Sequence, residues 1–442
     1  MVDPIALTHR RVLNIAVPIV VSNATVPILG IVDTGVVGQL GLPAPIGAVG
    51  LGALVLTAIY WIFGFLRMGT TGFASQAIGR GDMEEGAAIL SRALGIAALA
   101  GVAIIALQVP LFWAAFRLSP ASAEVEGLAR SYMGIRVFSA PALISLYAIT
   151  GWLIAAERTR AVLVVQLAMN GTNIVLDLWF VLGLGWGVEG VAVATVIAEW
   201  SGAILGLWFC RAAFAGTAWR DWSRVADPAK LKRFASVNTD IMIRSALLQA
   251  IFLSFLMWGA RYGDVTLAAN HILLLFLEVT AYAMDGFAFS AETLVGQALG
   301  ARRRAAFRRA AVLTGVWGGA TGLALAAAFL LGGGWIVDAM TTAPDVRDVA
   351  RDYLSYMVLA PILGAAAWMF DGIFIGATRT RDMRDMMIVS AVIYVVAALA
   401  LMPVFGNHGL WVAFLISFVA RGVTLGWKYP ALEASVGSAE RE

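Results

Sequence analysis

The chain has 442 residues, of which 60% are hydrophobic and only 13% are charged, and its net charge is +3. Soluble domains carry about 25% charged residues, so this composition excludes a soluble globular protein. Continuous apolar runs of about 20 residues recur along the chain, which predicts bilayer-spanning helices and excludes a β-barrel, whose strands alternate. The sequence therefore predicts an all-α polytopic membrane protein.

Twelve apolar segments are long enough to cross a membrane as helices. Glycine and proline mark many of the turns between them, as in GLPAP at 41–45 and FGNHG at 405–409. The predicted spans cover residues 10–40, 46–79, 86–117, 124–156, 160–184, 187–212, 232–260, 266–299, 305–338, 347–377, 384–406 and 408–432. An even number of spans places both ends of the chain on the same side of the membrane.

Lys and Arg gather in the turns that share a side with the N-terminus. The opposite side has only Arg117, Arg130, Arg261, Arg347 and Arg351. Because cytoplasmic loops carry an excess of basic residues, we expect a multi-pass protein of the cytoplasmic membrane with both termini in the cytoplasm.

The chain repeats itself with one fixed spacing, which is half of its length. The repeated motifs are QAIGRG at Gln76 and QALGAR at Gln297, ARSY at Ala129 and ARDY at Ala350, and RTR at Arg158 and Arg379. Each half holds six helices and enters the membrane from the same side, so the halves are expected to be related by a pseudo-two-fold axis along the membrane normal. We predict an N-lobe at 1–212, a cytoplasmic linker at 213–231 and a C-lobe at 232–442. Two such lobes suit a secondary transporter, although a duplication that only builds a scaffold would leave the same repeat.

Two aspartates lie in the membrane-spanning part of the first half. Asp33 is the one ionisable residue of the apolar run 15–40, and Asp177 lies midway along the span 160–184. An aspartate near a bilayer centre costs about 3 kcal/mol or more, so such a residue predicts a functional site. The matching positions of the second repeat hold Ser254 and Ala398, so the repeated architecture does not require either acid.

Asn170 and Asn173 share a helix face with Asp177, because they precede it by seven and four residues. If Asp33 approaches this face, the two acids form a coupled pair that can bind and release a proton. With amide and hydroxyl oxygens added, the same groups could hold Na⁺. The alternative is an aspartate satisfied by Asn and Thr that serves only helix packing.

A second set of acids lies in the second half. Glu278, Asp285 and Glu292 are seven residues apart and share one helix face, and Asp371 lies in the tenth span. We predict that these acids and Asn170 line a cavity that attracts cationic molecules. The alternative is ion pairing with Arg244 or Arg67.

Two prolines interrupt backbone hydrogen bonding in the first span. Pro18 and Pro27 are both candidates for a conformational hinge, and Pro27 lies six residues before Asp33. The chain has one cysteine, Cys210, so no intrachain disulfide can form. It shows no metal-ligand cluster, nucleophile motif or paired His–acid motif, so we predict no enzyme activity and no cofactor.

Four segments carry a resemblance to a known family. They are VPILGIVDTGVVGQLG at 26–41, NIVLDLWFVLGLGWGVEGVAVATVIAEW at 173–200, DGFAFSAETLVGQALGA at 285–301 and FDGIFIGATRTRDMRDMM at 370–387. The chain resembles the MATE (multidrug and toxic compound extrusion) family, and within it the DinF (DNA-damage-inducible protein F) branch of prokaryotes. The resemblance implies a MATE-like fold and export of organic cations or other amphiphiles in exchange for H⁺ or Na⁺.

The resemblance also implies roles for particular residues. The acidic network of the family's N-lobe maps onto Asp33, Asn173, Asp177 and Thr195, which would be the metal ligands if the coupling ion is Na⁺. The family's bending proline maps onto either Pro18 or Pro27. In another branch, carboxylates of the seventh, eighth and tenth helices bind sodium; here Asp371 matches the tenth-helix position, but the seventh helix has no acid beyond Asp240 near its start.

We therefore predict a secondary active multidrug efflux antiporter that works by alternating access, in the inner membrane of a prokaryote. Its expected partners are small cationic or amphiphilic molecules and the lipid bilayer, with no nucleic acid, and we expect a monomer. The alternative is a lipid-linked precursor flippase of the same superfamily, which would need a strongly cationic cavity. An intramembrane enzyme and a channel fit the motifs and the two lobes less well.

Overall fold

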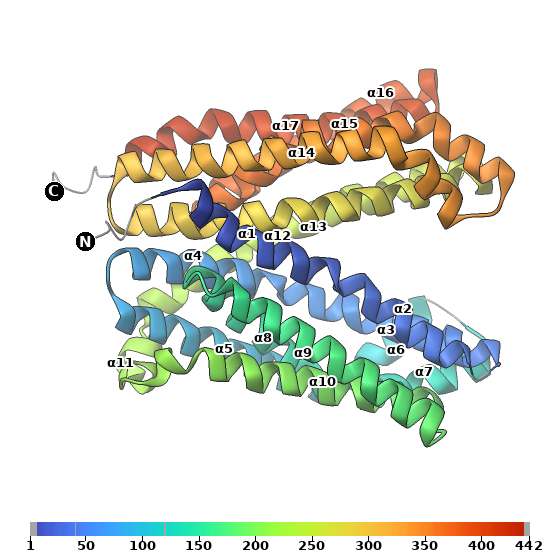
Figure 1. Ribbon diagram of the computed structural model, residues 1–442, viewed down its shortest axis with the longest axis horizontal. Helices are drawn as coiled ribbons and strands as arrows, with labels where there is room; N and C mark the ends of the chain where they lie inside the picture. The colour runs from blue at the N-terminus through green and yellow to red at the C-terminus, as the bar shows by residue number, and fades with distance from the viewer. Residues whose placement is uncertain (1–6, 40, 119–120, 437–442) are drawn as a thin grey trace. The chain divides into compact units, whose positions relative to one another are not determined.

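The computed structural model describes residues 7–39, 41–118 and 121–436, and all regular structure within these ranges is helical. The described residues contain 12 segments long and apolar enough to cross a membrane, which confirms the predicted number (Figure 1). These segments are His9–Gly38, Pro43–Gly79, Met83–Ala106, Ala123–Ala155, Thr159–Gly183, Gly187–Phe209, Pro228–Tyr262, Asp264–Gly300, Arg304–Met340, Pro344–Gly376, Thr380–Phe405 and Asn407–Ser435.

Several spans of the first half are interrupted, whereas those of the second half are nearly continuous. In the first half the helices are α1 (His9–Ala24), α2 (Val26–Gly38), α3 (Pro43–Trp61), η1 (Ile62–Gly64), α4 (Phe65–Gly79), α5 (Met83–Ala106), α6 (Gln108–Leu118), α7 (Ala123–Arg136), η2 (Val137–Ser139), α8 (Ala140–Ala155), α9 (Thr159–Asp177), the π-helical η3 (Leu178–Gly183) and α10 (Gly187–Phe209). In the second half they are α12 (Pro228–Gly259), η6 (Ala260–Tyr262), α13 (Asp264–Gly300), α14 (Arg304–Met340), α15 (Pro344–Gly376), α16 (Thr380–Phe405) and α17 (Asn407–Ser435).

The helix starts follow the sequence repeat. The first residues of α3 and α13, α5 and α14, α7 and α15, and α9 and α16 are all separated by the spacing of the repeated motifs. Local signals explain some of these starts: the Asp82 side chain accepts a hydrogen bond from the Glu85 backbone nitrogen at 2.9 Å, and a proline stands in the first turn of α3 and of α15. The equal spacing shows that the duplication reaches the level of individual helices.

The chain forms two compact units that do not follow the midpoint of the sequence exactly. One comprises Val21–Ala74 and Asp82–Leu231, and the other comprises Lys232 onward with Ser75–Gly81 and the described residues up to Val20. The two ends of α1 thus belong to different units. The predicted division into an N-lobe at 1–212, a linker at 213–231 and a C-lobe at 232–442 stays a prediction.

The linker segment packs against α5 of its own unit. It forms η4 (Arg211–Phe214), η5 (Ala218–Arg220) and α11 (Trp222–Val225), each in contact with α5. The guanidinium group of Arg92 on α5 donates to the backbone oxygens of Val225 and Arg224, both at 3.0 Å. Trp222 stays 76% exposed, as expected of a tryptophan at a membrane interface.

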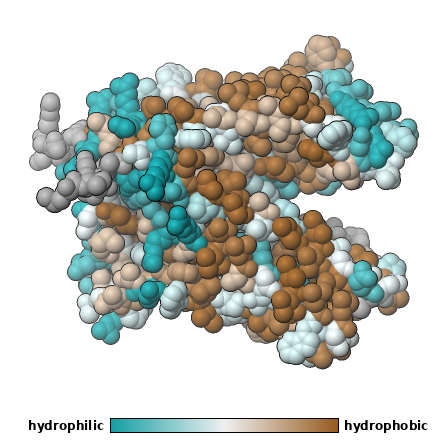
Figure 2. All heavy atoms as spheres, viewed as in Figure 1, coloured by the Kyte–Doolittle hydropathy of each residue, from teal (hydrophilic) through white to brown (hydrophobic). Residues whose placement is uncertain are grey.

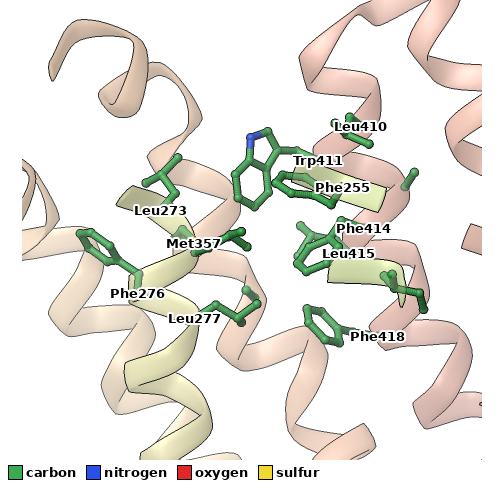
Figure 3. Packing of buried hydrophobic residues seen from close by; sticks show 14 of the residues in the cluster. Phe255, Leu273, Phe276, Leu277, Met357, Leu410, Trp411, Phe414, Leu415 and Phe418 are labelled. Carbon is green, nitrogen blue, oxygen red and sulfur yellow. The ribbon is translucent and has the colours of Figure 1, made fainter. Parts of the chain in front are cut away.

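An aromatic cluster fills the core of the second-half unit (Figure 3). Phe255 on α12 packs against Trp411 and Phe414 on α17, with ring centroids 4.4 and 4.8 Å apart. Beside it, Asn270 and Asn407 exchange hydrogen bonds of 2.9 and 3.0 Å, and the Trp411 indole donates to Asn270 at 2.9 Å. The two side-chain amides thus satisfy each other's hydrogen-bonding groups, for which lipid offers no partner.

The outer surface of the spans is apolar. Figure 2 shows hydrophobic residues along the middle of the helices and hydrophilic residues gathered near their ends. Leu331 and Trp335 on α14 are 86% and 84% exposed, and Trp427 on α17 is 83% exposed. Such exposure of large apolar side chains is stable only against lipid, which agrees with the membrane assignment.

Candidate ion-coupling site

The first span breaks at Thr25, between α1 and α2. Pro27 is the second residue of α2, where its missing N–H and fixed φ are tolerated, whereas Pro18 lies inside α1. Both prolines were candidates for the hinge, and the interruption lies next to Pro27. The turns of α2 that follow carry Asp33.

Asp33 lies on α2, which packs against α3, α9, α10 and η3. The Asn173 amide is satisfied in one orientation: its nitrogen donates to Asp33 Oδ1 and to Asp177 Oδ2, both at 3.0 Å, and its oxygen accepts from Thr195 Oγ1 at 3.2 Å. Asp177 and Asn173 are 0% and 1% exposed. The structure thus brings together the four residues Asp33, Asn173, Asp177 and Thr195.

One oxygen of this cluster lacks a donor. Asp177 Oδ1 is buried and receives no hydrogen bond from any described residue. The Asp33 and Asp177 carboxylates are each 3.0 Å from the same Asn173 nitrogen, and two ionised carboxylates cannot share a dry site without compensation. A proton between the acids, or a cation, would satisfy both groups at once.

The cluster continues along α9 to the helix break. Asn170, one turn before Asn173, donates to the backbone oxygen of Thr25 at 3.3 Å and to its hydroxyl oxygen at 3.1 Å. Gln166 donates to the Asn170 amide oxygen at 3.0 Å, and the Thr25 hydroxyl donates to the Ser22 backbone oxygen at 2.7 Å. One face of α9 therefore holds both the acid pair and the broken first span. Asn170 was predicted to line a substrate cavity; its hydrogen bonds are with Gln166 and Thr25, and its place in a cavity stays a prediction.

Asp177 itself stands at an irregular point of the backbone. It ends α9, and the π-helical segment η3 starts at the next residue. π-Helical turns are rare in proteins, and many of those known lie at functional sites.

Comparison with known proteins gives the family. The MatE family model matches residues 18–179 and 241–400, which is more than half of the chain and both repeats. The chain belongs to the MatE family. It is 36% identical to the DNA damage-inducible protein F of Escherichia coli strain K12 over 95% of this chain and 91% of that protein. This confirms the resemblance, and because proteins of the family are transporters, the chain is a membrane transporter and not an enzyme.

Solved MATE structures share its fold. An outward-facing multidrug resistance MATE transporter of the MOP superfamily matches with a TM-score of 0.87 at 20% identity, over 96% of both chains. The Vibrio cholerae MATE transporter VcmN in the bent form matches with a TM-score of 0.86 at 18% identity, over 97% of both chains. These matches confirm the MATE-like all-α fold.

Two charged residues of this MATE protein escaped the sequence analysis. Arg136 at the end of α7 and Glu199 on α10 form an ion pair of 2.5 Å, with their side chains only 11% and 7% exposed. Arg136 Nε and Glu199 Oε2 have no hydrogen-bond partner among the described residues. The repeat could have revealed them, since the matching positions of the second half hold Met357 and Ala420 and neither charge is duplicated.

Asp371 on α15 pairs with two arginines. It binds Arg244 on α12, the alternative raised from sequence, and lies 3.7 Å from Arg421 on α17. All three residues are at least nine-tenths buried, and the Nε atoms of both arginines and Asp371 Oδ1 have no hydrogen-bond partner within residues 7–39, 41–118 and 121–436. The cluster has two positive charges for one negative charge, so the Asp371 charge is already compensated.

The remaining predicted cavity acids lie on a single helix, α13. Glu292 is 1% exposed, Asp285 is half-buried and Glu278 is exposed. Asp240, in the first half of α12, is bound by Arg384 at 2.5 Å and by Thr380 at 3.2 Å. The role of Glu278, Asp285, Glu292 and Asp371 in a substrate cavity stays a prediction.

Proposed function

We propose that this transporter exports organic cations or other amphiphiles in exchange for H⁺ by alternating access, and that the ion binds between Asp33 and Asp177. The proposal rests on the Asn173 amide, which donates to one oxygen of each acid. The other oxygen of Asp177, Oδ1, has no donor among the described residues. Two acids held together in a dry site gain from one added proton.

Matching of hydrogen bonds in the ion-free site turns the Asn173 nitrogen toward the acids, and this assignment suits H⁺ better than Na⁺. Its nitrogen, a donor, points to the two carboxylates, and its oxygen points to Thr195. A sodium ion needs oxygen ligands, so Na⁺ binding by Asp33, Asn173, Asp177 and Thr195 would require the amide to turn over. A proton needs no such change.

The proposed cycle uses the break at Thr25. Protonation neutralises one of the two carboxylates to which the Asn173 amide donates. The hydrogen bond from Asn173 on α9 to Asp33 on α2 then becomes weaker. The first span can then change its bend beside Pro27, because the helix is interrupted at Thr25. Thr25 is held to α9 by the hydrogen bonds that it accepts from Asn170.

The test is transport by purified protein in liposomes, with a pH gradient and a Na⁺ gradient imposed separately. We expect a pH gradient alone to drive movement of a cationic dye, and Asp33→Asn to insert and fold but to lose gradient-driven export. Asp221→Asn is the matched control, because Asp221 lies in the exposed linker and asparagine caps a helix equally well. Export by Asp33→Asn at the normal rate would show that the site is wrong, and export driven by Na⁺ alone would assign the ion as Na⁺.

A lipid-linked precursor flippase is the second candidate. The observation in its favour is the buried Arg244–Asp371–Arg421 cluster, whose excess positive charge suits a phosphate group. A Pyrococcus furiosus MOP superfamily transporter of the same fold is described as having a binding pocket of reverse polarity that suggests a different function. Liposomes loaded with a fluorescent pyrophosphate lipid separate the candidates, since the antiporter proposal expects dye movement and no lipid translocation.

A further inference from the structure

A groove runs along α14 on the second-half unit, between this helix, α15 and α17. Its volume is about 580 Å³. It is lined by Arg308, Ala311, Val312, Gly315, Gly319, Ile362, Ala365, Ala366, Met369, Phe370, Ile373, Tyr429 and Glu433. The lining is apolar except at one end, where the charged residues lie. None of the residues that line the groove is close in sequence to Asp33 or Asp177.

Two glycines give the groove its depth. A Cβ atom added at Gly315 or at Gly319 would meet nothing within 4 Å, so the space beside them is open. From Arg308 to Gly319 the helix rises about 16 Å, which is close to half of the roughly 30 Å apolar core of a bilayer. The groove thus has the length of one leaflet, with its charged end at the helix terminus.

The charge at this end is positive. Glu433 is engaged by Arg304, whose Nε lies 3.3 Å from Glu433 Oε1. Arg308 is exposed, and no described residue forms a hydrogen bond or ion pair with its guanidinium group. Arg308 is therefore available to an anionic group at the mouth of the groove.

The repeat shows what lies beside part of the equivalent face in the first half. Ser91 and Leu94 on α5 correspond to Val312 and Gly315 on α14, and they line a cavity of about 420 Å³ whose other walls come from the linker. There the linker lays Phe214, Trp219 and Trp222 against the helix. On α14 the described residues supply no equivalent cover, and Val312 is 55% exposed. The apolar face of α14 is therefore open to an occupant from outside the described chain.

We propose that an anionic phospholipid occupies the groove, with its headgroup phosphate on Arg308 and one acyl chain along Gly315 and Gly319. Basic pockets between membrane helices on the cytoplasmic side commonly bind anionic headgroups, and the arginines of the turn before α14 mark the predicted cytoplasmic side. The structure assigns this site independently of the ion-coupling site.

The experiment measures lipid binding to the purified full chain by native mass spectrometry, with phosphatidylglycerol and phosphatidylcholine titrated separately. We expect phosphatidylglycerol to bind more tightly. Arg308→Gln should weaken phosphatidylglycerol about fivefold, as loss of one cation near a headgroup predicts. Gly315→Leu with Gly319→Leu should abolish saturable binding of both lipids, because the new side chains fill the groove.

Two matched controls separate a built site from general attraction. Arg309→Gln removes a neighbouring exposed arginine that does not line the groove, and Gly332→Leu adds the same side chain to an open position elsewhere on α14. Neither should change lipid binding. Leucine favours helix over glycine, so the groove-filling variant should melt no lower than the wild type in lipid-free detergent. Equal effects of Arg309→Gln and Arg308→Gln, equal binding of the two lipids, or unchanged binding to the filled groove would each overturn the proposal.

Discussion

Asn170 donates hydrogen bonds to both oxygens of Thr25, the residue at which the first span breaks. This contact joins the break to the helix that carries Asn173 and Asp177. A change at the acid pair and a change in the bend of the first span therefore act on the same face of α9.

Replacing Asn170 with leucine should uncouple the break from α9. The variant leaves the Thr25 backbone oxygen without its side-chain donor, at a cost of about 1–3 kcal/mol. We expect slower gradient-driven dye export with little change in the dye concentration for half-maximal rate, measured in liposomes. Gln166→Leu is the control, because it removes the donor to Asn170 but keeps both bonds to Thr25; an equal loss in the two variants would argue against the contact.

The Arg136–Glu199 ion pair should be sensitive to removal of one partner and tolerant of removal of both. Arg136→Met leaves a buried carboxylate unpaired and should lower the free energy of unfolding by about 3–5 kcal/mol, whereas Arg136→Met with Glu199→Met should recover most of it. A double-mutant cycle of unfolding in detergent measures the coupling. Additive effects of the two single changes would contradict the pair.

Removal of the Asp371 charge should lower the stability of the fold. Asp371→Asn leaves Arg244 and Arg421 buried without a counter-charge, and we expect a loss of about 3–5 kcal/mol in unfolding free energy. The protein that still folds should keep its dependence on the driving ion. Asp338→Asn is the comparison, since its pairs with Arg351 and Arg347 are partly exposed and such pairs contribute about 0–1 kcal/mol. If the folded Asp371→Asn variant showed a changed dependence on the driving ion, Asp371 would have a role in ion coupling.

Cys210 should resist alkylation in the native protein. It lies just beyond α10, is 0% exposed, and burial raises the pKa of its thiol to about 12. At pH 8, well below this pKa, on the order of one thiol in ten thousand is the reactive thiolate. We expect no maleimide labelling of the native chain and one label per chain after denaturation, with exposed Ala305→Cys as the positive control. Rapid native labelling would show that the thiol is accessible.

Sequence patterns predicted Asp33 and Asp177 as functional candidates because the repeat gave a control within the chain: an acid required by the duplicated architecture should occur twice. The same comparison applies to Arg136 and Glu199, which were overlooked although Glu199 is the one charged residue of the stretch 190–210. Arg421 was missed for another reason, since its partner Asp371 lies two spans away and spacing along one helix cannot reveal such a pair.

Hydropathy and motif spacing were enough to establish the twelve spans, the internal duplication and the asymmetry of the acids between the halves, because these are properties of the linear chain. Which charges meet depended on helix packing. Asn173 stands between Asp33 and Asp177 only because α2 packs on α9 after the break at Thr25, and Asp371 is neutralised only because α12 and α17 present their arginines to it. Contacts between helices depend on the direction and register of each helix, which hydropathy and motif spacing do not determine.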